Sequence, residues 1–427
     1  MKPPTAKSGY SKRVRRKSRL RAAWQVVLEN GLKSKSPETV KAVNAFKTFA
    51  ESEINKIQNK LQKGTWKFDP SDGILAKREG KSPRPIVVAS IPNRIVQRSI
   101  LDVLQDDDSI KKYIHTPSSF GGVKNKKVRD AIECAYRAID ADAKFYIRSD
   151  IKGFFTQIPR NTVINIISEA IPDESFIQLL KEATNIELQN LAKLKKFAHL
   201  FPLRDVGVAQ GCCLSPLMGN ILLYDFDMMM NKGDVTTIRY IDDFLILAPD
   251  QNTATRAFRK AKDYLKEYSM SVYDPTTDRQ KAEHGSILKG FTFLGCKIVK
   301  GLITPTKKSQ DQLISKVNEI INESISLMTR PDEMKKNKVS LIETLSLVDR
   351  TVSGWGNQYA FCNDRQQFEY VDSKINEAIK RYLSFYHHHK NRLSEKKDVN
   401  SMRQLLGVQP LNRCKKNFIL PLKPTAK

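Results

Sequence analysis

Two adjacent acids, Asp242 and Asp243, lie at the centre of the stretch RYIDDFLIL, between two runs of β-branched and aromatic residues. Adjacent residues at a hairpin turn can both project towards one point, because the turn interrupts the alternation of a strand. Buried like charges are costly unless a cation, a proton or solvent compensates them. A third acid, Asp150, ends the stretch KFYIRSD, which alternates as a strand. These three residues are the candidate catalytic acids.

Three carboxylates from two strands are hard oxygen ligands of the kind that Mg²⁺ prefers. Two such ions, about 3.5–4 Å apart, can activate a 3′-hydroxyl and stabilise a leaving pyrophosphate. The expected ions are therefore two Mg²⁺, with Mn²⁺ as an alternative, and nucleotidyl transfer is a reaction that such a site can perform. For the Asp-Asp pair taken alone, an exposed surface turn is the plainer interpretation, since this dipeptide is common.

The elements that must position these acids follow from residue periodicity. Residues 144–150 predict a strand, and TTIRYIDDFLILA (236–248) predicts a strand, a tight turn and a second strand. A Gly-rich loop, VGVAQGCC, leads into a helix for which Ser215 and Pro216 supply the cap and the first turn. Residues 69–85 are rich in turn formers and bases. Helical spacing is found over 37–62, 93–104 and 160–200, and over most of 308–390, which includes the amphipathic run LISKVNEIINESISLM.

The charge of the chain is large and uneven. Its 427 residues carry a formal net charge of +27, of which residues 1–36 hold +10 and residues 381–427 hold +9. A folded centre with basic ends indicates a polyanionic partner, most simply nucleic acid. A solvated basic surface is the alternative. The segment KRVRRKSRLR (12–21) could also be a nuclear localisation signal, but the same basicity at the other end favours a nucleic-acid contact.

The six cysteines form no CxxC pair and no zinc-ligand spacing, so they are expected to be reduced thiols. No apolar run approaches the roughly 20 residues that span a bilayer, and no apolar stretch follows the basic N-terminus as in a signal peptide. Three consecutive histidines, 387–389, cannot all converge on one ion from a helix, which argues against a metal site there. We therefore expect a cytoplasmic protein with no membrane partner.

Four motifs, in order along the chain, resemble those of a reverse transcriptase, in particular the bacterial branch related to group II intron enzymes. They are SPRPIVVASIPNRIVQRSI (82–100), SDIKGFFTQIP (149–159), VGVAQGCCLSPLMGNILL (206–223) and RYIDD (239–243). The resemblance extends to about residue 362 through TVSGWGNQYAFCN, which is similar to a thumb segment of intron-type enzymes. It implies an α+β right-hand polymerase whose palm holds an antiparallel sheet. The implied domains are a basic N-terminal extension (1–36), an N-terminal helix and fingers (37–140), a palm (141–303), a helical thumb (304–390) and a basic C-terminal tail (391–427).

The resemblance also implies roles for individual residues. Asp150, Asp242 and Asp243 would be the catalytic metal ligands, joined by the carbonyl of Ile151, and Lys281 would protonate the leaving pyrophosphate. Phe155 would be the aromatic steric gate that selects dNTPs, although ordinary core filling is the alternative for it and for its neighbour. The nucleotide pocket would also contain Lys77, Arg84, Gly153, Phe154, Gln210, Gly211 and Tyr240. Template and primer contacts would be made by Arg94, Phe293, Leu294, Gly295 and Trp355.

The biological role follows by elimination. After the thumb, residues 391–427 carry no Cys/His endonuclease pattern of the kind common in intron maturases, and Tyr-Ile-Asp-Asp replaces the Tyr-Ala-Asp-Asp usual in retron enzymes. The match then favours a stand-alone, defence-associated "unknown group" reverse transcriptase. Such an enzyme would make cDNA from a bound, dedicated, structured non-coding RNA in antiphage defence. A maturase-type, RNA-binding splicing cofactor and an RNA-directed RNA polymerase are the alternatives; the intact aspartates and Phe155 argue against them.

Overall fold

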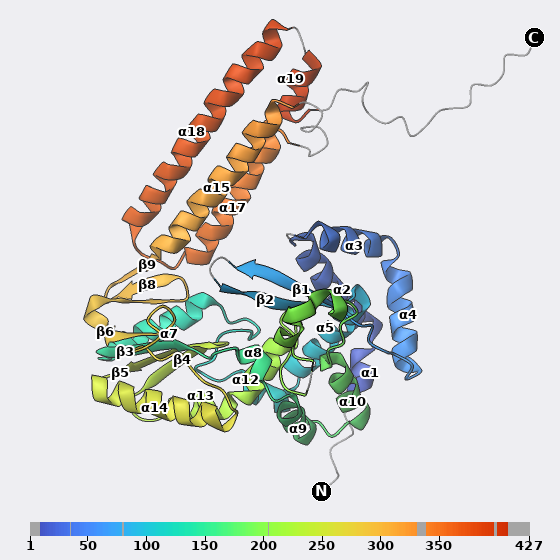
Figure 1. Cartoon of the computed structure of the whole chain (residues 1–427), viewed down its shortest axis with the longest axis vertical. Coiled ribbons are helices and arrows are strands. Elements are labelled where there is room, and N and C mark those ends of the chain that lie inside the picture. The colour runs from blue at the N-terminus through green and yellow to red at the C-terminus, as the bar shows by residue number, and fades with distance from the viewer. Residues whose placement is uncertain are drawn as a thin grey trace, which may run out of the picture. The chain divides into compact units, whose positions relative to one another are not determined.

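A four-stranded antiparallel sheet, in the order β4-β5-β3-β6, carries the three acids in the computed structural model of the protein (Figure 1). Its strands are β3 (Phe145–Asp150), β4 (Thr236–Tyr240), β5 (Asp243–Ala248) and β6 (Glu283–Ser286). The structure describes residues 9–34, 36–78, 81–203, 205–330, 339–396 and 399–408. They fall into two compact units, Met1–Lys289 and Gly290–Lys427. The predicted strand and the predicted strand–turn–strand segment are confirmed.

One face of this sheet is buried against two helices, α13 (Tyr224–Met230) and α14 (Gln251–Glu267). Because successive strand residues point to opposite faces, Phe244 and Ile246 of β5 share the helix-covered face. Phe244 stacks on Phe258 of α14 with ring centroids 6.4 Å apart and meets Phe226 of α13 at 5.9 Å. The helix α7 (Val128–Asp140) contacts β4 and β5. The sheet that carries the acids is therefore stabilised by its packing against α13 and α14.

Residues 69–85, rich in turn formers, contain strands rather than only turns. The strands β1 (Asp72–Arg78) and β2 (Lys81–Val88) pair antiparallel, with Ala76 opposite Arg84. Val87 is buried with Phe201, Leu194 and Ile186, so long-range packing stabilises the hairpin. Such packing cannot be seen in local composition, which explains why the periodicity missed these strands.

The first unit contains many further helices. Residues 37–62 form two helices rather than one continuous helix, because the chain turns at Phe49 so that Val43 and Ile54 can both reach the core. Ser215 is not the cap of its helix: Leu214 holds that position, and the Ser215 hydroxyl donates to the Ala209 carbonyl. The other bounds are α1 (Tyr10–Val14), α2 (Lys17–Leu32), α3 (Pro37–Thr48), α4 (Ala50–Gln62), α5 (Ile91–Gln105), α6 (Asp108–Ile114), α8 (Phe154–Gln157), α9 (Arg160–Ala170), α10 (Glu174–Thr184), α11 (Leu191–Leu194), η1 (Lys195–Leu200), α12 (Ser215–Leu222) and η2 (Ile287–Lys289).

The basic N-terminal segment is part of this packing. Leu20, Trp24 and Val27 of α2 are buried in the same core as α5. Arg13 pairs with Asp107 at 3.3 Å. The basic segment 12–21 is therefore part of two packed helices, α1 and α2. The first eight residues and residues 409–427 of the predicted basic tail lie outside the described residues.

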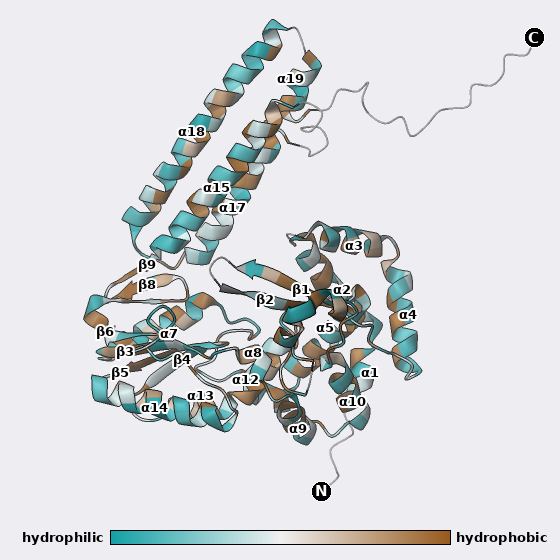
Figure 2. Cartoon of the chain, viewed as in Figure 1, coloured by the Kyte–Doolittle hydropathy of each residue, from teal (hydrophilic) through white to brown (hydrophobic). Residues whose placement is uncertain are grey.

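The second unit joins a small sheet to long helices. Its strands β7 (Phe291–Phe293), β8 (Cys296–Val299) and β9 (Leu302–Pro305) form an antiparallel sheet. The helices α15 (Lys307–Met328), α17 (Leu341–Tyr359), α18 (Arg365–Glu395) and α19 (Val399–Leu406) share a core that includes Tyr382 and Ile321. Figure 2 shows teal and brown residues alternating along α15 and α18, as amphipathic packing requires. The predicted amphipathic helix is confirmed.

The mixture of helices and antiparallel sheets confirms the predicted α+β class. Within the described residues, none of the helices is both long and apolar enough to cross a membrane. The predicted domain boundaries stay predictions.

Candidate active site

Asp150 and Asp243 lie on the same face of the sheet because they are direct cross-strand partners. In the antiparallel register of β3 and β5, Asp150 is opposite Asp243, and Arg148 is opposite Leu245. The Cβ atoms of such partners are about 4.5–5.5 Å apart, close enough for like charges to repel. Two of the predicted catalytic acids are therefore brought together by register alone.

Asp242 joins this pair from the two-residue turn between β4 and β5. Tyr240 pairs with Asp243, which leaves Ile241 and Asp242 as the turn. The N–H of Ile151 donates to the Asp242 carbonyl oxygen at 3.1 Å, so the turn is attached to the end of β3. Ile241 has a φ of 64°, in the left-handed region that β-branched residues rarely adopt. The predicted tight turn is present, and its backbone is strained.

Burial raises the pKa of both Asp242 and Asp243. At Asp242, desolvation is the largest cause, and the negative charge of Asp150 adds to it, so the pKa rises to about 6. At Asp243, desolvation followed by the charges of Asp150 and Asp242 raises the pKa to about 7. The positive charge of Arg84 opposes the shift at Asp242. Carboxylates that disfavour one another's ionisation in this way form a site that a cation would stabilise.

Lys281 places an ammonium group beside these acids. Its Nζ lies 3.2 Å from Asp150 Oδ2 and 5.3 Å from the centre of the Tyr273 ring. Its N–H donates to the Asp278 carbonyl at 2.8 Å, which fixes the loop that carries it. The structure thus places Lys281 beside Asp150, and its role as a proton donor stays a prediction.

The second oxygen of Asp150 fits a metal ligand. Oδ1 is buried and has no hydrogen-bond partner among the residues that the structure describes. A buried carboxylate oxygen without a partner is costly unless a cation coordinates it. Within the same residues, no group of three or more His, Cys, Asp or Glu side chains is placed so that it could hold a metal ion. The donor set is suited to Mg²⁺; the Ile151 carbonyl as a further ligand stays a prediction.

The hairpin β1–β2 joins the loop that precedes α12. Arg84 Nε donates to Gln210 Oε1 at 2.5 Å, and the Val87 N–H donates to the Gln210 carbonyl at 2.8 Å. Gly211 has a φ of 116°, and a Cβ there would lie 2.6 Å from the Val87 carbonyl oxygen. Glycine is therefore required at this position. Three predicted nucleotide-pocket residues, Arg84, Gln210 and Gly211, thus lie together, and the charge of Arg84 reaches Asp242.

Phe154 and Phe155 have different surroundings. Gly153, with a φ of 57°, caps α8, which begins at Phe154. Phe154 is only 2% exposed, and a Cβ at Gly219 would lie 2.7 Å from its ring. Phe155 is half-buried, and its carbonyl accepts a hydrogen bond from the Val208 N–H at 2.7 Å. Phe154 therefore fills the core, which leaves Phe155 as the candidate gate.

Three other predicted residues contribute less directly. Arg94 is half-buried, and its Nε donates to the Ala89 carbonyl at 2.8 Å, so part of its guanidinium is used within the protein. Lys77 is exposed at the β-bulge of β1. Tyr240 is half-buried and precedes the turn formed by Ile241 and Asp242. Their proposed contacts with template and nucleotide stay predictions.

The remaining predicted residues lie in the second unit and are described within it. Phe293 ends β7, and Leu294 and Gly295 form the turn to β8 with φ values of 47° and 82°. A Cβ at Gly295 would lie 2.7 Å from the Tyr359 hydroxyl oxygen, and the Trp355 ring centroid is 4.9 Å from that of Tyr359. Gly295 and Trp355 thus both lie beside Tyr359, and the contacts of all four residues with template or primer stay predictions.

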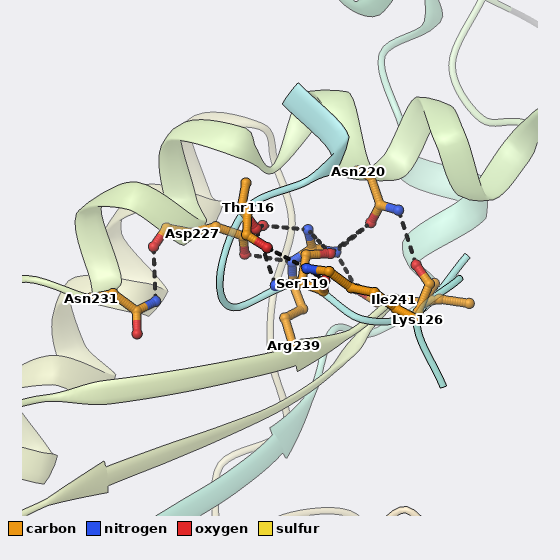
Figure 3. A network of polar contacts seen from close by, with 9 residues as sticks. Thr116, Ser119, Lys126, Asn220, Asp227, Asn231, Arg239 and Ile241 are labelled. Carbon is orange, nitrogen blue, oxygen red and sulfur yellow. Dashed lines mark hydrogen bonds and ion pairs between the residues drawn. The ribbon is translucent and has the colours of Figure 1, made fainter. Parts of the chain in front are cut away.

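Sequence reasoning missed Arg239 and Asp227. Arg239 of β4 is fully buried and forms a two-pronged ion pair with Asp227 of α13 (Figure 3). The sequence held one signal, because a charged residue in the apolar strand before the acid pair is rarely buried unless it is paired. The sequence held no such signal for Asp227, since acidic residues on helices are common.

Comparison with known proteins identifies related sequences. The family described as "Reverse transcriptase (RNA-dependent DNA polymerase)" matches residues 75–298, which is more than half of the chain. The group II intron-encoded protein LtrA of Lactococcus lactis subsp. cremoris is 28% identical over 181 residues, which are 42% of this chain and 28% of that protein. Protein YkfC of Escherichia coli (strain K12) is 22% identical over 314 residues, covering 63% of this chain and 78% of that protein. Among solved structures, apo telomerase from Candida tropicalis is similar with a TM-score of 0.41 and 14% identity, over 79% of this chain and 68% of that chain.

The matched segment spans only 28% of the length of LtrA, and only 26% of the length of another relative, an uncharacterized 91 kDa protein in the cob intron of Schizosaccharomyces pombe.

Proposed function

This chain belongs to the reverse transcriptase (RNA-dependent DNA polymerase) family, and from that premise we propose that it copies RNA into DNA by metal-assisted nucleotidyl transfer. The observation that carries the proposal is the convergence of Asp150, Asp242 and Asp243 at one end of an antiparallel sheet. The proposed organisation is a right-hand polymerase with fingers to residue 140, a palm over 141–303 and a thumb over 304–390.

The three aspartates would hold two Mg²⁺ ions. Bound there, Mg²⁺ would lower the pKa of the primer 3′-hydroxyl and offset the charge of the leaving pyrophosphate. The buried, unpartnered Oδ1 of Asp150 and the mutual repulsion of the acids support this assignment. Mn²⁺ would serve as an alternative ion.

The chain's own side chains would position the nucleotide. Arg84 binds the β- and γ-phosphates, with Lys77 as a second cation, and the hydrogen bond from Arg84 to Gln210 supports that position. Phe155 packs beneath the sugar and excludes a 2′-hydroxyl. Lys281, 3.2 Å from Asp150, donates its proton to the pyrophosphate as the bond to the α-phosphorus breaks.

Primer extension on an RNA template tests the polymerase proposal. Wild-type protein with Mg²⁺ and dNTPs should extend the primer, and an Asp242→Ala/Asp243→Ala variant should not, although its circular dichroism should match that of the wild type. Absence of extension by folded wild-type protein, or equal extension by both proteins, would contradict the proposal.

The finer role proposed is synthesis of cDNA from one dedicated, structured non-coding RNA, in the cytoplasm and in antiphage defence. The net charge of +10 in residues 1–36 and +9 in residues 381–427 supports a polyanionic template. Splicing assistance is the second candidate, because a group II intron-encoded protein is among the relatives.

Sequencing the RNA and DNA that co-purify with the protein separates these two roles. One abundant structured RNA, with complementary DNA only in the wild type, supports a dedicated template, and phage plating on the same two strains then tests defence. Bound intron RNA, with no DNA that depends on the aspartates, would instead support the splicing role.

A further inference from the structure

The arginine just before the catalytic turn is buried to an unusual degree. Arg239 is 0% exposed and is the largest fully buried side chain among the described residues. Its Nε donates to Asp227 Oδ1 at 2.7 Å, and its Nη2 donates to Asp227 Oδ2 at 2.6 Å. Asp227, also fully buried, comes from α13, which precedes β4 in the chain.

The rest of the guanidinium reaches the turn itself. Nη1 donates to the Ile241 carbonyl oxygen at 3.0 Å and to Asn220 Oδ1 at 2.9 Å, and Nη2 donates to the Ser119 hydroxyl at 3.0 Å. Figure 3 shows these groups gathered around the arginine, with Ile241 at one end and Asp227 at the other. The ion pair is therefore connected to the residue that precedes Asp242 by one hydrogen bond.

A neighbouring loop closes on the same turn from outside. The Asn220 amide donates to the Gly121 carbonyl at 2.9 Å, and a Cβ at Gly121 would lie 2.6 Å from the Ile241 nitrogen. The backbone of Gly121 thus lies against the turn, and Arg239 binds the turn directly at the Ile241 carbonyl and the Gly121 loop through Asn220. These two contacts matter because Ile241 has a strained backbone conformation, with a φ of 64°. Such a conformation persists only where the surrounding structure constrains it.

Stability alone does not explain such an ion pair. Taking two charges out of water is expensive, and replacement by apolar residues of similar volume is often neutral or stabilising. Bidentate geometry, in contrast, gives directional control that a hydrophobic pair cannot supply. The arrangement is suited to fixing the position of the turn.

We propose that Arg239, oriented by Asp227, is a positioning residue that fixes the Ile241 turn and thereby holds Asp242 and Asp243 in register with Asp150. The proposal rests on the proposed polymerase function. Arg239 does not touch substrate; it acts through the backbone of the turn.

An Arg239→Met/Asp227→Leu double variant tests this proposal, because it removes both buried charges together and keeps side-chain volume. We expect its thermal unfolding midpoint to be equal to or above that of the wild type, while kcat for primer extension falls about 100-fold, as a misplaced catalytic group produces. The KM for dNTP and the affinity for template RNA should hardly change. Mn²⁺ binding without substrates, followed by electron paramagnetic resonance, should weaken because the carboxylates are no longer held together.

Two further variants keep the test decisive if the double variant does not fold. Arg239→Lys retains the positive charge beside Asp227 but lacks the guanidinium N–H groups that donate to Ile241 and Asn220. This variant should therefore fold but have a lower kcat. Arg160→Met removes another buried arginine of the same unit, which donates to the Thr184 carbonyl, and should cost stability without lowering kcat per folded molecule.

The outcomes separate the two proposals. A wild-type enzyme that extends primers, together with folded Arg239→Lys and double variants that keep full kcat and full Mn²⁺ affinity, would overturn the positioning role and leave the polymerase proposal intact. A folded wild-type enzyme without activity would contradict the polymerase proposal instead, and Mn²⁺ binding would still report whether Arg239 orders the acids.

Discussion

Asp243 makes the metal-free protein sensitive to pH. Its folded-state pKa of about 7 lies above the usual value of 3.8, so between these values the folded protein holds a proton that the unfolded chain releases. The stabilisation from this proton is complete below pH 3.8 and is lost as the pH rises through 7. Asp243→Asn should therefore raise the free energy of unfolding above pH 7, by up to about 1.4 kcal/mol for each unit of the pKa shift, and have little effect near pH 4.

Urea unfolding without divalent ions, at several pH values, measures this effect. Asp263→Asn, which removes an exposed acid of α14, is the matched control for the loss of one carboxylate. An Asp243→Asn protein whose stability differs from the wild type by the same amount at every pH would show that burial does not perturb this carboxyl.

Phe155 is the residue on which sugar selection is expected to depend. Its neighbour Phe154 is committed to the core, whereas Phe155 is only half-buried. Phe155→Val should admit NTPs by removing the ring beneath the sugar, and Phe155→Tyr should retain exclusion because it keeps the ring. The ratio of kcat/KM for dNTP and NTP measures the change, and an unaltered ratio in the valine variant would assign the gate elsewhere.

Among the elements, the hairpin β1–β2 and the loop before α12 depend on one glycine. Gly211→Ala would place a methyl group 2.6 Å from the Val87 carbonyl and force an unfavourable φ. We expect a loss of at least about 1 kcal/mol in stability and a higher KM for dNTP, since Arg84 and Gln210 would shift together.

Gly233→Ala separates the effect of the unfavourable φ from the effect of the clash with the Val87 carbonyl. Gly233 also has a positive φ, of 72°, but a Cβ there would meet nothing within 4 Å. Thermal unfolding and nucleotide titration of both variants should show the strain of a positive φ in each, and a raised KM only at Gly211. Equal KM values would mean that the hairpin does not support the nucleotide.

The elements also mark how far sequence reasoning could reach. Alternation in residues 144–150 and 236–248 predicted the strands and the tight turn that carry Asp150, Asp242 and Asp243. The pairing of β3 with β5 joins segments far apart in the chain, so the meeting of Asp150 with Asp243 was expected from the motif resemblance and not from local pattern. The hairpin β1–β2 was missed because its strands are stabilised by Phe201 and Leu194, far along the chain. The pair of Arg239 and Asp227 was missed because nothing in the local pattern joins a strand residue to an acid of a separate helix. Residues whose partners belong to other elements require the fold before they can be recognised.

For the whole molecule, the charge of +27 should make RNA binding strongly salt-dependent. Some N-terminal cations are already paired with acids, as Arg21 is with Glu51 at 2.7 Å, whereas Lys12 and Lys33 are exposed. Replacing Lys12 and Lys33 by Gln should make the plot of log RNA-binding constant against log salt concentration less steep. The slope should fall in magnitude by about 0.7–0.9 for each RNA phosphate contact that is lost.

Arg21→Gln serves as the comparison and should change the slope less. Filter binding or anisotropy with a structured RNA, over a series of salt concentrations, gives the slopes. Identical slopes for wild type and the doubly neutralised variant would remove this end of the chain from the RNA contact.

The strained turn at Ile241 has a consequence for engineering the protein. Glycine at this position would relax a backbone conformation that costs of order 1–3 kcal/mol in other residues, so a search for heat-resistant variants would favour Ile241→Gly. The same change would loosen the support of Asp242 and Asp243. We expect a higher melting temperature with slower synthesis, which calorimetry and primer extension would show together. Thermal stability and catalytic rate would therefore be opposed at this one residue, and selection for stability alone would produce a more stable but slower enzyme.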